Sequence, residues 1–229
     1  MSTLSRTAER ARALRVPTMA GWLLVAGGIL YFVGGSMHPK EDPEGVTLKE
    51  HLRVMYEDPA WYSAHTIFLV GMVLLAAALI VLVRSGSLRG NRSTHTAAVV
   101  AAYATTAAAA GSLLHLVSGS EADRIASGAG TPLTDVLMVA ETIYAPAFGL
   151  SIAALAAVGA MTRTLGNWVA AALGVIGGLA YALAGGTFLL TDALDPLFPV
   201  SSATALWAVI VGVAALRRGR GSSTETAVR

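Results

Sequence analysis

The amino-acid sequence predicts an all-α polytopic integral membrane protein: a bundle of six transmembrane helices with both termini in the cytoplasm. Of its 229 residues, 55% are hydrophobic and 13% are charged, whereas soluble domains usually carry about a quarter charged residues. Several apolar runs are long enough to cross roughly 30 Å of hydrocarbon at 1.5 Å per residue. Arginines gather in alternate connections between these runs. These three observations together define the fold class.

Six spans are predicted, at 18–37, 60–83, 96–117, 133–161, 167–190 and 199–216. They place the membrane domain at 17–217, between a basic N-terminal segment, 1–16, and a polar tail, 218–229, expected to be disordered. The first span follows arginines, as a signal peptide does. It is too long for that role and no small-residue cleavage site follows it, so we expect an uncleaved helix.

The direction of the spans follows from the charges in the connections. If the spans alternate, one side receives the following arginines: Arg6, Arg10, Arg12, Arg15, Arg84, Arg89, Arg92, Arg163, Arg217, Arg218 and Arg220. The two longer connections on the other side, 38–59 and 118–132, hold four basic residues against eight acidic ones. Because cytoplasmic connections carry the excess of Lys and Arg, the arginine-rich side is predicted to be cytoplasmic. We expect the protein in a cell membrane, specifically a bacterial inner membrane.

The connection between the first two spans, residues 39–58, is the longest on the outer side. Its sequence TLKEHLRVMYED predicts a short helix that Thr47 caps, with Glu50 completing a capping box. Leu48, Leu52 and Met55 recur at helical spacing and would share one face. Two interpretations are open: an amphipathic helix on the membrane surface, or a helix packed over the bundle.

The second span begins with an Asp-Pro pair, in which Asp58 caps the helix and Pro59 takes its first position. Trp61 and Tyr62 follow at once. At that depth the sequence predicts that both rings belong to the aromatic belt of the membrane interface.

Three of the five histidines are predicted to lie at the outer ends of consecutive spans. His38 follows the first span, His65 lies near the start of the second, and His115 lies near the end of the third. Glu141 lies about nine residues into the fourth span, roughly 13 Å from its outer end. An ionisable residue inside a span normally faces the bundle interior, so it marks a functional site by default. We expect these four residues to form an outward-facing pocket.

The first functional hypothesis is a metal or haem site. Three imidazoles and a carboxylate suit a divalent metal ion, with His38, His65, His115 and Glu141 as ligands. A b-type haem requires two axial histidines at similar depth, and His65 and His115 meet that condition. The chain has no HxxxH, HExxH or CxxC motif, and it has no cysteine at all.

The runner-up is a membrane-embedded enzyme acting on an isoprenoid or lipid substrate. Glu141 would be its general acid or base in an apolar cavity, with His65, His115 or Asp192 orienting it or relaying protons. This chemistry resembles that of membrane terpene cyclases, which protonate an alkene with an acidic residue. No family motif accompanies the resemblance, so whether the protein is an enzyme stays open.

Two further hypotheses are a small proton-coupled transporter and an accessory membrane subunit. Glu141 with Pro146 beside it fits a transporter, and a chain this small would then work as a homo-oligomer. In an accessory subunit, Glu141 would only hydrogen-bond between helices. The expected surroundings are the lipid bilayer. No nucleic acid is expected, because the predicted topology accounts for the arginines.

Overall fold

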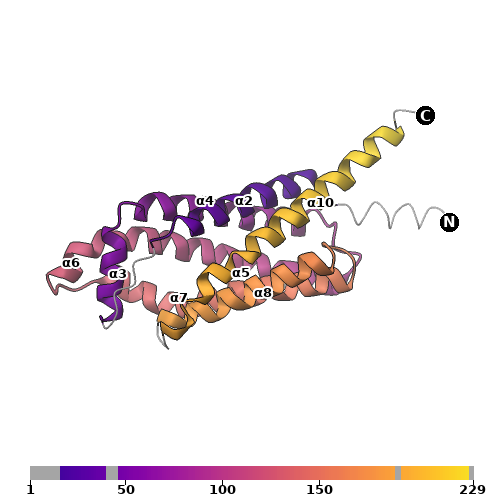
Figure 1. Cartoon of the computed structure of the whole chain (residues 1–229). Coiled ribbons are helices and arrows are strands. Elements are labelled where there is room, and N and C mark those ends of the chain that lie inside the picture. The colour runs from indigo at the N-terminus through magenta and orange to yellow at the C-terminus, as the bar shows by residue number, and fades with distance from the viewer. Residues whose placement is uncertain (1–15, 40–45, 189–191, 227–229) are drawn as a thin grey trace.

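The computed structural model of the chain describes residues 16–39, 46–188 and 192–226 (Figure 1). Every regular element among them is helical, and six of the helices are long and apolar enough to cross a membrane. They are α2 (Thr18–Ser36), α4 (Trp61–Arg84), α5 (Arg92–Ser118), α7 (Pro132–Met161), α8 (Trp168–Ala184) and α10 (Ala203–Thr226). The predicted fold class, an all-helical chain with six helices of membrane-spanning length, is confirmed. The direction of the helices across the membrane stays a prediction.

Some helix ends differ from the predicted spans. α5 begins at Arg92 rather than at 96, because the side chain of Asn91 caps it by accepting a hydrogen bond from the Thr94 N–H at 3.0 Å. α8 ends at Ala184 and gives way to a short 3-10 helix, η2 (Gly185–Phe188). α10 continues to Thr226, into the segment predicted as a polar tail. Residues 1–15 of the predicted basic segment and residues 227–229 lie outside the described residues.

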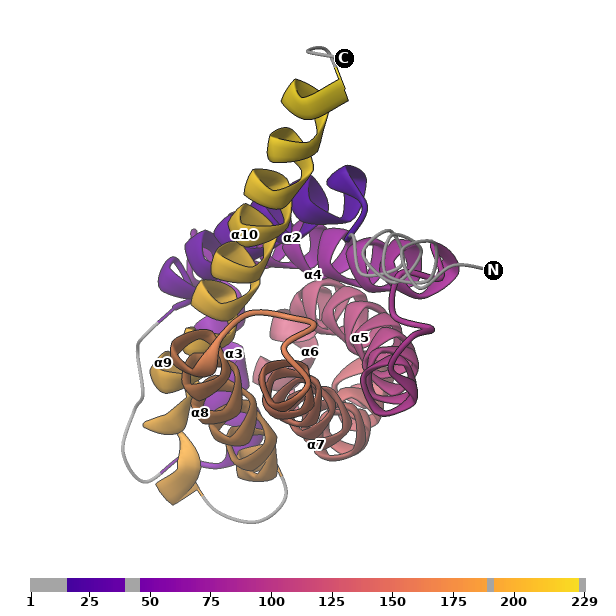
Figure 2. The same ribbon diagram turned by 90° about the vertical axis from the view of Figure 1, so that its right-hand side faces the viewer.

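The six long helices form a closed ring in chain order (Figure 2). Each one packs against the next, and α10 returns to pack against both α8 and α2. Along the last contact, Gly21 faces Leu216 while Gly28 faces Ala205, so α2 and α10 run antiparallel. The ring therefore brings the end of α2, the start of α4 and the end of α5 to the same end of the bundle.

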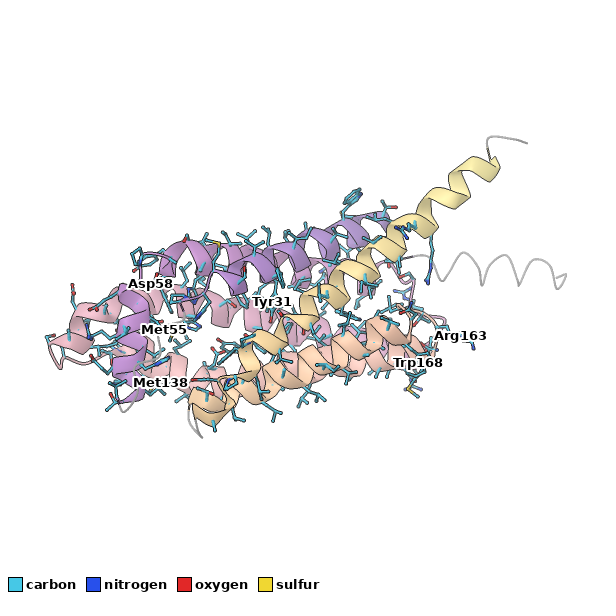
Figure 3. All side chains as sticks on the ribbon, in the orientation of Figure 1. Tyr31, Met55, Asp58, Met138, Arg163 and Trp168 are labelled. Atoms are coloured by element: carbon cyan, nitrogen blue, oxygen red, sulfur yellow. The ribbon has the colours of Figure 1, made fainter. Side chains whose placement is uncertain are left out.

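Aromatic rings fill the middle of the ring of helices. Tyr31 of α2 packs on Phe68 of α4, with 4.7 Å between ring centroids, and on Phe148 of α7 at 6.5 Å. Phe148 in turn meets Tyr181 of α8 edge-on at 5.2 Å. The labelled Tyr31 lies midway along the bundle in Figure 3. These contacts tie four of the six helices together at their centre.

Small residues allow the helices to approach closely. A Cβ atom added at Gly149 of α7 would overlap the carbonyl oxygen of Gly178 of α8, and one at Gly178 would overlap the carbonyl oxygen of Gly149. Membrane helices gain little from hydrophobic association because lipid tails are equally apolar, so close van der Waals packing at small residues holds them together.

A short helix, α3 (Leu48–Glu57), follows α2 and precedes α4 in the chain, and it crosses one end of the bundle (Figure 1). Thr47 caps it as predicted, by accepting a hydrogen bond from the Glu50 N–H at 3.3 Å. Leu52 and Met55 are buried, and they pack with Trp61 and with Met138 of α7. Figure 3 shows Met55 and Met138 together at this end of the molecule. The contacts favour the interpretation that α3 packs over the bundle.

Polar contacts hold both α3 and the segment that follows α5 against the start of α7. The ammonium group of Lys49 on α3 lies 2.6 Å from the Asp135 carboxylate and donates to the Thr131 hydroxyl at 2.9 Å. Glu121, in the short 3-10 helix η1 (Gly119–Glu121), accepts hydrogen bonds from the N–H groups of Leu133 and Thr134 at 3.2 and 2.8 Å. The carboxylate of Glu121 thus satisfies the first amides of α7, which have no partner within the helix.

Candidate metal centre

Three histidines from consecutive segments of the chain meet at the end of the bundle that α3 covers. His38 lies two residues after the end of α2, His65 lies in the second turn of α4, and His115 lies in the last turn of α5. One ring nitrogen from each lies within 4.8 Å of those from the other two. The ring centroids are 4.8 Å apart for His38 and His65, 4.8 Å for His65 and His115, and 6.3 Å for His38 and His115. The three histidines expected at one end of the bundle thus lie close together, which the sequence had left open.

The backbone fixes the ring orientation of two of the three histidines. The Nδ1 atom of His65 lies 2.8 Å from the carbonyl oxygen of Trp61, and that of His38 lies 2.9 Å from the carbonyl oxygen of Pro39. A carbonyl oxygen only accepts hydrogen bonds, so in both rings Nδ1 carries the proton. The lone pair then resides on Nε2. The Nε2 atom of His65 is buried and has no hydrogen-bond partner among the described residues.

The surroundings favour neutral imidazoles. His65 is 4% exposed. Burial lowers the pKa of His38, against the opposing effect of its hydrogen bond to Pro39. A neutral imidazole offers a lone pair, which is the form that binds a metal ion.

Trp61 forms one wall of the cluster. Its ring centroid lies 3.7 Å from that of His65, 5.2 Å from that of His115 and 6.1 Å from that of His38. The indole N–H donates to the carbonyl oxygen of Leu116 at 3.3 Å, and the residue is fully buried. The prediction that Trp61 belongs to the interfacial aromatic belt was wrong, because the ring turns inward onto the histidines. Its neighbour Tyr62 is 53% exposed and does face outward.

Glu141 lies beside the cluster, behind His115. Its carboxylate oxygen Oε2 is 4.0 Å from Nδ1 of His115, and the hydroxyl of Tyr144, one turn later on α7, donates to the same oxygen. Glu141 is 2% exposed. The carboxylate is not a member of the group of three nitrogens.

The other residues singled out from the sequence lie elsewhere or cannot be placed. Asp192 begins the short 3-10 helix η3 (Asp192–Leu194), and its side chain lies outside the part of the chain that the structure describes. His95 lies in the first turn of α5, at the opposite end from His115. Trp61 is the residue at the site that the sequence analysis missed. Its spacing of four residues from His65 on one helix was the available signal.

The comparisons with known proteins give no relative: no protein-family model, no curated protein and no solved structure matches the chain. The fold and the site alone define its class. It is a multi-pass helical membrane protein with a cluster of three histidines at one end of the bundle.

Proposed function

We propose that this protein binds one divalent transition-metal ion through His38, His65 and His115. The observation that carries the proposal is the convergence of three ring nitrogens within 4.8 Å of one another. The hydrogen bonds from Nδ1 of His38 and His65 to backbone carbonyls support it, because metal-binding histidines nearly always donate their other ring N–H in this way.

The ligand type narrows the choice of metal. Imidazole nitrogens suit Zn²⁺, Cu²⁺, Ni²⁺ and Fe²⁺, whereas Mg²⁺ and Ca²⁺ prefer oxygen ligands. Zinc–nitrogen bonds are about 2.0–2.1 Å long, so the three rings would close in slightly around the ion. Three protein ligands leave a fourth position for water or substrate, which is the arrangement of catalytic rather than structural zinc sites.

The geometry supports a single ion better than a haem. A b-type haem would have to lie between the rings of His65 and His115. The centroids of those two rings are 4.8 Å apart. The rings of His38 and Trp61 also pack against the ring of His65. A flat macrocycle would have to displace both neighbours, whereas an ion requires only small side-chain rotations.

The alternative is a membrane-embedded enzyme in which Glu141 acts as general acid or base on a lipid or isoprenoid. The observation in its favour is a buried carboxylate held by the Tyr144 hydroxyl. Under this alternative Glu141→Gln abolishes turnover and no metal is needed. Under the metal proposal Glu141→Gln still binds metal, because the three ligands remain.

The experiment is a metal titration of the detergent-purified protein after chelation and dialysis. Co²⁺ serves as the probe because its absorption bands report coordination by nitrogen, and elemental analysis after loading with Zn²⁺ gives the stoichiometry. We expect about one ion per chain, lost in His38→Ala, His65→Ala and His115→Ala. His95→Ala, at the other end of α5, is the matched control and should bind normally. A folded wild-type protein that takes up neither ion would overturn the proposal.

A further inference from the structure

Glu141, Tyr144 and His115 form a chain of polar contacts that leads away from the histidine cluster. The Tyr144 hydroxyl donates to Oε2 of Glu141, and the same oxygen lies 4.0 Å from Nδ1 of His115. Of the basic side chains in the described part of the chain, that of His115 lies within ion-pair distance of Glu141. Burying an isolated carboxylate in a membrane bundle costs free energy, so a carboxylate at this depth marks a functional site by default. Its position beside His115 suggests what that function is.

We propose that Glu141 is a positioning residue for the metal site, with Tyr144 holding it in place. This inference rests on the proposed metal-binding function. The carboxylate would accept the Nδ1–H of His115 and so direct the other nitrogen, Nε2, to the ion. Glu141 would thus do for His115 what the carbonyl of Trp61 does for His65 and the carbonyl of Pro39 does for His38. All three ligands would then present the same nitrogen.

A carboxylate does more in this position than a carbonyl does. It makes the imidazole a stronger base and a better metal ligand. It also brings a negative charge close to a dication that three neutral ligands leave uncompensated, in surroundings of low dielectric where that charge matters most. These effects give the buried carboxylate of Glu141 a function.

The packing of α5 against α7 keeps the carboxylate in register with the histidine. Gly111 lies four residues before His115 on α5, and a Cβ atom added there would overlap the ring of Tyr144. The glycine therefore makes room for the tyrosine that holds Glu141. Residue 111 offers a way to disturb the contact chain without touching any proposed metal ligand.

The test compares Co²⁺ affinity and the Co²⁺ absorption spectrum across variants of the full chain in detergent. Glu141→Ala should weaken binding by about 10–100-fold, the effect typical of removing a hydrogen-bond partner of a metal-bound histidine. Glu141→Gln should lose less, because the amide oxygen still accepts the Nδ1–H but carries no charge. Glu57→Gln, on the exposed side of α3, is the matched control and should change nothing.

Two further variants test the tyrosine. Tyr144→Phe removes one hydroxyl, and Gly111→Ala pushes the ring aside. Each should weaken Co²⁺ binding and shift the spectrum, but less than Glu141→Ala does. Tyr103→Phe, an exposed tyrosine on α5, is the control for the loss of a hydroxyl.

The outcomes separate this inference from the proposed function. If the wild type binds Co²⁺, histidine variants lose it and Glu141→Ala binds as the wild type does, the positioning role is overturned while the metal site stands. If Glu141→Ala fails to fold, Glu141→Gln and Tyr144→Phe take its place as the test. Unchanged Co²⁺ affinity and an unchanged Co²⁺ spectrum in both variants would overturn the positioning role. If the folded wild type binds neither Co²⁺ nor Zn²⁺, the metal site and the positioning role fall together.

Discussion

The Nδ1 atom of His65 lies 2.8 Å from the carbonyl oxygen of Trp61, one turn earlier on α4. The indole ring of the same Trp61 packs on the imidazole, with 3.7 Å between centroids. One residue therefore fixes both the tautomer of the histidine and the plane of its ring. A ligand held in this way before the ion arrives has less conformational freedom to lose on binding.

This contact predicts an optical signal from Trp61. Cu²⁺ and Co²⁺ have partly filled d shells that quench tryptophan emission at short range, whereas Zn²⁺ has a full shell. Titration with Cu²⁺ or Co²⁺ should quench part of the protein's fluorescence in proportion to site occupancy, and Zn²⁺ should not. Steady-state fluorescence in detergent measures this directly.

The control for that signal is Trp61→Phe, which leaves the other three tryptophans in place. Trp168, for example, lies at the opposite end of the bundle in Figure 3. The remaining emission of this variant should be insensitive to the ion. Equal quenching in Trp61→Phe and the wild type would mean that the ion binds somewhere other than the histidine cluster.

Glu121 is predicted to stabilise the start of α7. Glu121 is 4% exposed, and its carboxylate accepts hydrogen bonds from the N–H groups of Leu133 and Thr134. Glu121→Ala leaves both donors without that partner, and the buried N–H of Thr134 left unsatisfied costs about 1–3 kcal/mol. We expect a lower midpoint of thermal unfolding, followed by circular dichroism in detergent. Asp123→Ala, at an exposed position nearby, should unfold as the wild type does; equal midpoints for the two variants would contradict the capping role.

The fold was predictable from the sequence because its determinants are local. Hydropathy and helix length locate a membrane span without any tertiary contact. Helix ends were less predictable, since they depend on individual side chains such as Asn91, which starts α5 four residues earlier than the hydropathy does. The cap formed by Glu121 could not be anticipated, because it joins residues 121 and 134 across a connection whose conformation hydropathy does not describe.

The candidate site was predictable in its members and not in its geometry. Placing His38, His65 and His115 at one end requires only alternating spans, and the structure agrees. The rotation of each helix about its own axis is set by packing, however, and hydropathy does not reveal it. For this reason Trp61 was assigned to the membrane interface although it turns inward. The same limit left open whether Glu141 is a ligand or a neighbour.

The glycines between α7 and α8 are predicted to be essential for packing. Gly149→Val would place a branched side chain against the backbone of Gly178, where even a Cβ atom overlaps the carbonyl oxygen. Overpacking of this kind costs typically 1–3 kcal/mol, and more where backbone must move. Unfolding in detergent should show the loss. Gly35→Val is the matched control, because a Cβ atom there meets nothing within 4 Å; similar losses for both would point to an effect unrelated to helix packing.

The direction of the bundle can be tested by labelling, because the chain has no cysteine of its own. The arginine-rich connections predict that Gly90, between α4 and α5, faces the cytoplasm and that Asp123, in α6 (Ala122–Ala126), faces outward. Both positions are exposed. In intact cells a membrane-impermeant maleimide should label Asp123→Cys, and it should label Gly90→Cys only after the cells are opened. The histidine cluster lies at the same end as α6, so this result would place the proposed metal site on the outer side, where it would draw its ion from outside the cell. The reverse labelling pattern would show that the bundle has the opposite direction, and the proposed metal site would then take its ion from the cytoplasm.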